Sequence, residues 1–148
     1  MKILIAVDDS PHSERAVEFV TRMRWPAGSR VIVASAAVPP IAVANGPFEA
    51  GVAVPAEVLQ EAQKHAKTTV DWISGELQSA GFSTETRVLV GDPREALMRL
   101  AEEERADLIV VGSHGRTGLS KLLLGSVSSH VVTHAQCSVL VVKENPAH

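Results

Sequence analysis

The sequence predicts a single α/β domain over residues 1–148, an open five-stranded parallel sheet with helices on both faces. The chain has the length of one domain, and 45% of its 148 residues are hydrophobic. Only 3% are aromatic and none is Tyr, so Val, Ile, Leu and Ala must fill the core, as they do in parallel sheets and their covering helices. Short apolar runs alternate with segments of helical periodicity, the pattern of βαβ units.

The first third of the chain predicts a strand, a helix and a second strand. Residues 3–7 are continuously apolar, which is typical of a strand covered on both faces. Residues 8–11 (DDSP) then supply a helix cap followed by Pro at the first helical position, and this helix ends by Trp25. The apolar run 31–38 predicts the second strand, which two prolines terminate.

Residues 41–55 predict a long loop, and residues 57–81 predict the longest helix. Apolar residues recur in that helix every three to four positions, and Gly81 supplies its C-terminal stop. Residues 84–90 are rich in β-branched side chains and alternate with polar ones, which favours a strand toward one edge of the sheet.

The last third predicts a capped helix, a strand, a short helix and a final strand. Asp92 is the expected N-cap, with Pro93 first in the helix and Glu95 placed to reach back in a capping box. Residues 108–111 predict the fourth strand, and residues 139–142 predict the fifth after a short helix.

Charge and composition exclude several classes of function. The net charge of −3 provides no basic field for nucleic acid, and few aromatic residues are present to stack on bases. No apolar run approaches the roughly 18 residues that a membrane span needs. The chain's one cysteine, Cys137, cannot form an internal disulfide, so a cytoplasmic location is expected.

Glycines follow the fourth strand at the place where an open α/β sheet binds its ligands. Gly112, Gly115 and Gly118 let main-chain amides approach an anion without a Cβ in the way, and Gly125 precedes the last helix. The hydroxyls and amides of the serines that open this helix would complete a phosphate cradle. Neither GxxxxGK[ST] nor GxGxxG is present, which argues against a P-loop NTPase and a dinucleotide-binding fold.

The spacing of Gly112, Gly115 and Gly125-Ser126 resembles the ATP-binding branch of the universal stress protein family. The resemblance covers nearly the whole chain, through the segments Lys2–Ser10, Gly91–Pro93, Asp107–Gly125 and Ser138–Lys143. It implies a Rossmann-like, adenine nucleotide alpha hydrolase-like fold, ATP with magnesium as the ligand, and a role in stress response or signalling. It also implies a homodimer formed through the last strand, by Val139, Leu140, Val141 and Val142.

The same resemblance implies a role for each site residue. The base would lie against Ala6 and Val7 and be recognised by the backbone around Ala36, where relatives often have a larger aliphatic residue. Asp8 would accept hydrogen bonds from the ribose hydroxyls. Val111 and Gly112 would pass close to the ribose and α-phosphate. The phosphates would be surrounded by His114, Gly115, Arg116, Gly125, Ser126, Val127 and Ser128.

Simpler interpretations exist for the same residues. Asp8 is also what a helix cap or turn after a strand requires, and the glycines are also what a strained loop requires. His114 has no other ligand at metal-binding spacing, so no protein-held metal is expected, and His12 is expected on the surface or on a helix face. No catalytic residue is predicted; the alternatives for function are a slow ATPase or a nucleotide-free interaction protein. The last strand's edge is alternatively covered by the C-terminal tail.

Overall fold

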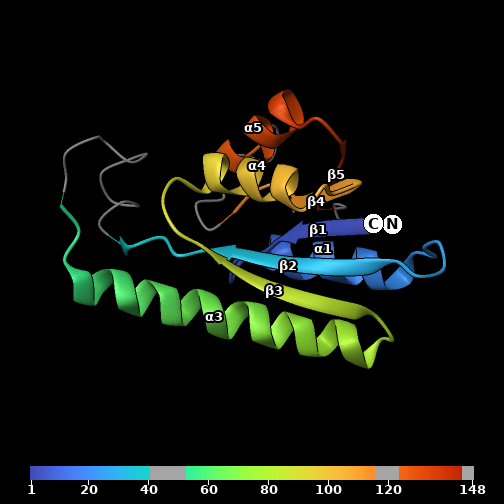
Figure 1. Ribbon diagram of the computed structural model, residues 1–148, viewed down its shortest axis with the longest axis horizontal. Helices are drawn as coiled ribbons and strands as arrows, with labels where there is room; N and C mark the ends of the chain where they lie inside the picture. The colour runs from blue at the N-terminus through green and yellow to red at the C-terminus, as the bar shows by residue number, and fades with distance from the viewer. Residues whose placement is uncertain (41–52, 116–123, 145–148) are drawn as a thin grey trace.

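The computed structural model describes residues 1–40, 53–115 and 124–144. Strands and helices alternate along these residues, as Figure 1 shows. The elements are β1 (Lys2–Ala6), α1 (Pro11–Arg22), β2 (Arg30–Ala36), α3 (Ala56–Ser79), β3 (Ser83–Leu89), α4 (Pro93–Glu103), β4 (Leu108–Gly112), α5 (Ser126–His134) and β5 (Ser138–Val142).

The five strands form one parallel sheet in the order β3-β2-β1-β4-β5. The predicted fold class is therefore confirmed, as is the edge position of β3. β1 pairs with β2 on one side and with β4 on the other, in the registers Ile3↔Val31 and Ile3↔Leu108. The strand order reverses between β1 and β4, so the chain leaves these two neighbours toward opposite halves of the sheet.

Helices cover both faces of the sheet. α3 packs against β2 and β3 while α1 packs against β4 and β5, and α4 and α5 lie on the other face (Figure 1). Alternate residues of the central strands feed two separate cores. The first core includes Ile3, Ile5, Val33, Val20 and Leu77, and the second includes Leu4, Ile32, Ile109, Leu97 and Val131.

Caps and turn residues explain where several helices begin and end. Ser10 caps α1 by accepting a hydrogen bond from the amide of Ser13, and Pro11 follows it. Gly81, with φ of +94°, ends α3 as expected, and Phe82 N donates to Leu77 O behind it. None of the helices in the described ranges has the length and apolarity that crossing a bilayer requires.

Strand bounds and one helix cap differ from the sequence-based expectation. β2 and β3 run over residues 30–36 and 83–89 instead of 31–38 and 84–90, because their pairing ends where Ala36 meets Leu89. Asp92 caps α4 through the amide of Arg94, 2.9 Å from Oδ1, while the carboxylate of Glu95 lies 3.5 Å from His130 Nε2. Residues 53–55 are irregular as predicted, and the rest of the predicted loop lies outside the described residues.

Candidate functional site

A cavity of about 210 Å³ opens at the carboxyl ends of β1, β2 and β4, beside the reversal of strand order. It gathers nearly every residue that the sequence predicted for the site. Those in its lining are Ala6, Val7, Asp8, Ala36, Val111, Gly112, His114, Gly115, Gly125, Ser126, Val127 and Ser128. Arg116 lies outside the described residues.

A change in side-chain size along two strands creates the apolar end of this cavity. On the face covered by α4 and α5, β1 carries Leu4 and then Ala6, and β2 carries Ile32 and then Ala34 and Ala36. The large residues fill the core, whereas the small ones two and four positions later leave a space above the sheet. The cavity therefore begins where the sheet's side chains become small.

Sequence reasoning missed six residues of the lining: Ser13, Ala34, Val38, Leu89, Pro93 and Leu97. The last two come from the start of α4, which walls the apolar end. A salt bridge lies at the start of the same helix: Arg94 donates to both carboxylate oxygens of Asp92, at 3.1 and 2.8 Å. The hydrogen bonds from Arg94 hold the pKa of Asp92 below its usual range.

The Asp8 side chain stabilises the turn between β1 and α1 and also faces the cavity. Its Oδ1 accepts hydrogen bonds from Ser13 Oγ at 2.7 Å and from Ser10 N at 3.0 Å. Its Oδ2 makes no hydrogen bond to any described residue and lies beside Gly115, where an added Cβ would sit 2.9 Å from it. One oxygen of the carboxylate is thus structural and the other is available to a ligand.

The N-terminus of α5 forms the polar end of the cavity. No side chain caps this helix at Gly125, and the amide of Ser129 makes the bond back to Gly125 O at 2.9 Å. The amides of Ser126, Val127 and Ser128 precede that bond and have no acceptor within the helix. Unpaired amides at a helix start carry partial positive charge, so this end of the cavity suits an anion.

The hydroxyl of Ser128 holds the surrounding loops together. It lies 2.9 Å from Ser113 O and 3.1 Å from Gly125 O, and Gly125 N donates to the same Ser113 carbonyl at 2.7 Å. A Cβ on Gly125 would lie 3.2 Å from His114 Cα, so the two loops touch through their main chains. Ser128 therefore offers an anion its amide, since its hydroxyl proton already has acceptors.

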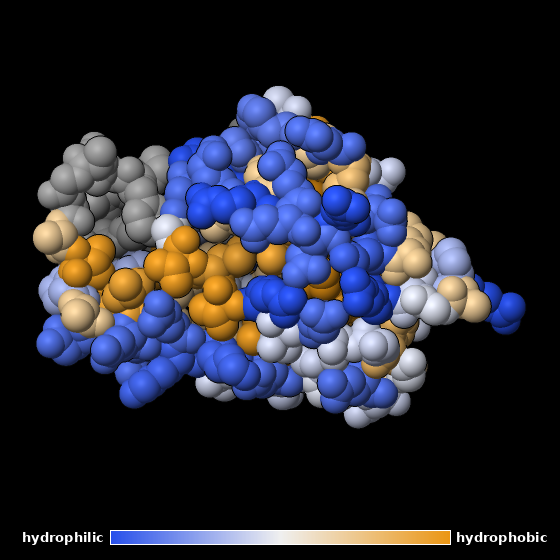
Figure 2. Space-filling view, in the orientation of Figure 1, coloured by the Kyte–Doolittle hydropathy of each residue, from blue (hydrophilic) through white to orange (hydrophobic). Residues whose placement is uncertain are grey.

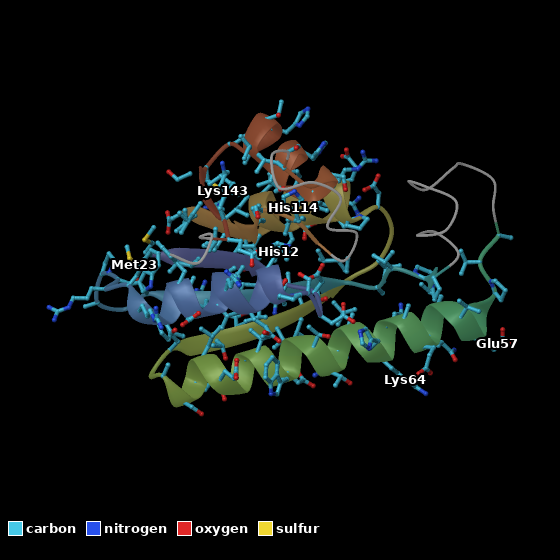
Figure 3. The ribbon with its side chains drawn as sticks, turned by 180° about the vertical axis from the view of Figure 1, so that it is seen from behind. His12, Met23, Glu57, Lys64, His114 and Lys143 are labelled. Atoms are coloured by element: carbon cyan, nitrogen blue, oxygen red, sulfur yellow. The ribbon has the colours of Figure 1, made fainter. Side chains whose placement is uncertain are left out.

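Two histidines meet at the side of this polar end. The rings of His12 and His114 have centroids 5.3 Å apart and planes inclined by 50°, and Figure 3 shows them together between α1 and the loop after β4. His12 is half-buried on α1, so of the two expected places, the surface or a helix face, it occupies a helix face. Across the described ranges, no group of three His, Cys, Asp or Glu side chains is placed to hold a metal ion.

A second hollow, about 740 Å³, lies between α3 and the end of β3 and contains no predicted site residue. Its walls include Gln60, Gln63 and Lys67 from the helix and Val88 and Val90 from the strand side. Figure 2 shows an apolar band bordered by polar side chains on this face of the molecule. The hollow is an open surface groove, without the converging amides and carboxylate of the first cavity.

Comparison with known proteins gives one consistent family. A model of the universal stress protein family matches residues 1–143. Universal stress protein MJ0577 of Methanocaldococcus jannaschii is 39% identical over 87 residues, which cover 59% of this chain and 54% of that protein. In this sequence comparison the chain spans about half the length of the first curated relatives that it matches.

Solved structures extend the likeness to the whole chain. The structure of MJ0577 has a TM-score of 0.81 and 32% identity, and the alignment covers 99% of this chain and 97% of that one. A universal stress protein in complex with cAMP has a TM-score of 0.68 and 29% identity, covering 96% of each chain. The Archaeoglobus fulgidus protein in complex with dAMP has a TM-score of 0.68 and 26% identity, covering 97% and 98%.

Proposed function

Because the chain belongs to the universal stress protein family, we propose that it binds ATP with magnesium and acts as a nucleotide-dependent module in stress response or signalling. One observation carries the proposal. The free carboxylate oxygen of Asp8, the apolar hollow above Ala36 and the unpaired amides at Ser126 all face one cavity. In an adenine nucleotide, the ribose hydroxyls would match the Asp8 oxygen, the base the apolar hollow and the phosphates the amides.

Each part of the nucleotide has a matching part of the cavity. The adenine would lie in the apolar end, between the alanines of β1 and β2 and the α4 residues Pro93 and Leu97. The ribose hydroxyls would donate to Asp8 Oδ2. The phosphates would accept hydrogen bonds from the amides that open α5. Relatives solved with cAMP and dAMP support an adenine nucleotide here.

The residues of the lining favour a nucleotide that stays bound as a regulator over one that is hydrolysed. Asp8 is the one carboxylate among the described lining residues, and two hydrogen bonds hold its Oδ1 in the turn before α1. Activation of water needs a base positioned beside the γ-phosphate. Magnesium would be held mainly by phosphate oxygens and water, as is usual for this ion.

The direct test is to denature freshly purified protein and identify the released small molecule by mass spectrometry. We expect ATP or ADP at close to one per chain. Nucleotide-free protein should also gain thermal stability with millimolar ATP and magnesium, because a ligand that binds only the folded state stabilises it. An absence of both released nucleotide and thermal shift would support a nucleotide-free interaction protein. Steady phosphate release abolished by Asp8→Ala in folded protein would instead favour a slow ATPase.

We further propose a homodimer formed by the free edge of β5. This strand pairs with β4 on one side and ends the sheet, with Val139, Leu140 and Val141 half-buried. Uncovered apolar edges tend to pair with other strands, and a two-fold axis would satisfy both edges together. We also propose a cytoplasmic location, on the ground of the one cysteine.

Strand alternation gives a selective test of this dimer. Ser113 N donates to Val142 O, so the main-chain groups of Val142 face β4 and those of Val141 face the free edge. Val141→Pro removes an amide from the free edge while sparing the pairing with β4. We expect light scattering to show a monomer for Val141→Pro and a dimer for Val141→Thr, the control that keeps the amide. A dimeric proline variant would contradict the proposal.

A further inference from the structure

Ser13 makes a reciprocal pair of hydrogen bonds with Asp8 across the turn that joins β1 to α1. Its Oγ accepts from Asp8 N at 2.8 Å and donates to Asp8 Oδ1 at 2.7 Å. The side chain is buried, with only 5% of the residue exposed, and it lines the cavity. This hydroxyl therefore fixes both the backbone and the side chain of Asp8.

The second donor to Asp8 is a main-chain group. Ser10 N reaches the same Oδ1 at 3.0 Å, so this oxygen has two donors, whereas Oδ2 has none among the described residues. Without Ser13 Oγ, a single amide would hold the carboxylate. The terminal torsion of Asp is broad and nearly two-fold, so one donor does not determine which way the free oxygen points.

We propose that Ser13 is a positioning residue that orients Asp8 Oδ2 into the cavity and thereby makes the site select ligands with ribose hydroxyls. This inference rests on the proposed nucleotide binding. An acceptor that is already fixed before binding discriminates best between ligands with and without hydroxyl groups, because no side-chain entropy is lost in ordering it. Ser13 acts on the ligand through Asp8.

The test compares the affinities of nucleotide-free protein for ATP and for 2′,3′-dideoxy-ATP by calorimetry. The wild type should prefer ATP by about ten- to hundredfold, the range for hydrogen bonds to a charged group. Ser13→Ala should reduce this preference by about three- to tenfold, which corresponds to the ordering of one side chain. Ser13→Cys, which keeps the size but donates weakly, should behave alike and replaces the alanine variant if that fails to fold.

Ser10→Ala is the matched control. It removes the cap of the same helix, where Ser10 Oγ lies 3.4 Å from Ser13 N, and should lower stability. It keeps both donors to Asp8, because Ser10 contributes to Asp8 through its main-chain amide. Its preference for ATP should equal that of the wild type, with folding of each variant checked by thermal unfolding.

Two results would overturn the inference while leaving nucleotide binding intact. One is an unchanged ATP preference in folded Ser13→Ala and Ser13→Cys, with both ligands weakened equally, as a purely structural cap requires. The other is a wild type that binds both nucleotides equally well. If the wild type binds neither nucleotide, the proposed function itself is wrong, and the inference falls with it.

Discussion

Gly112 packs directly against His12, so that a Cβ added to the glycine would lie 2.9 Å from both the Cβ and the carbonyl oxygen of the histidine. The backbone of α1 thus fills the space where a side chain would go. The sequence suggested that Gly112 lets an anion approach the main chain. The structure gives it another role, the close approach of a helix to the end of β4.

Gly112→Ala should therefore destabilise the protein itself. The clash involves main-chain atoms that cannot rotate away, and overpacking of this kind costs about 1–3 kcal/mol of unfolding free energy. Urea denaturation without nucleotide measures this loss. Gly75→Ala is the control, since nothing lies within 4 Å of its added Cβ inside α3, and it should gain about 0.5–1 kcal/mol. Equal stabilities for the two variants would contradict the packing argument.

Gly115→Ala should act on ligand binding through Asp8. Its Cβ would meet the terminal oxygen Oδ2 at 2.9 Å, and a carboxylate can rotate aside, so the fold should be little affected. We expect affinity for ATP to fall about tenfold, the loss of one hydrogen bond to a charged group. Calorimetry in the wild type and in Asp8→Ala completes a double-mutant cycle. If Gly115→Ala weakens binding equally in both backgrounds, its effect does not pass through Asp8.

The order of elements could be predicted because the apolar runs 3–7, 31–38 and 108–111 each coincide with a buried strand. Ile3–Val7 has no polar residue, as a strand with a core on each face requires, and it is central in the sheet. The glycine spacing and Asp8 could be found from the sequence as well. The outcome for Asp8 combines the two interpretations, because Oδ1 serves the turn while Oδ2 faces the cavity.

The walls of the cavity could not be predicted, because they depend on which elements become neighbours in space. Leu89 and Leu97 line it from β3 and α4, and nothing local distinguishes them from other core leucines. The sequence did contain one indication of the cavity: on one face of β2, the side chains become small from Ile32 to Ala34 and Ala36. Ser13 was missed because a serine in the first turn of a helix has an ordinary role there.

Ala36→Phe should block binding while leaving the fold intact. Position 36 is half-buried at the apolar end of the cavity, so a phenyl ring would occupy the space proposed for adenine. We expect the thermal shift with ATP and magnesium to disappear, which corresponds to an affinity loss of about a hundredfold or more for a filled site. Ala36→Val is the control and should retain the shift, because it adds only two methyl groups. Undiminished ATP binding by Ala36→Phe would place the base elsewhere.

Asp92 should make the stability of the protein depend on pH in the acidic range. Hydrogen bonds from Arg94 lower the pKa of Asp92 in the folded state, so the carboxylate stabilises the fold above its ordinary pKa of about 3.9. That contribution is lost as the pH falls through the lowered value. Asp92→Asn keeps a capping side chain without the charge and should be less stable at pH 7 by about 0.3–1 kcal/mol, the range for a charge at a helix N-terminus.

The difference between wild type and Asp92→Asn should stay constant from pH 8 to pH 5 and shrink below about pH 4, where Asp92 begins to bind a proton in the unfolded chain while the folded chain still holds it charged. Urea denaturation at several pH values measures it. Arg94→Gln is the control, because it removes the largest cause of the lowered pKa and should move the loss of stability to higher pH. A difference that stays the same down to pH 3 would mean that the Asp92 charge does not stabilise the start of α4, the helix that walls the cavity.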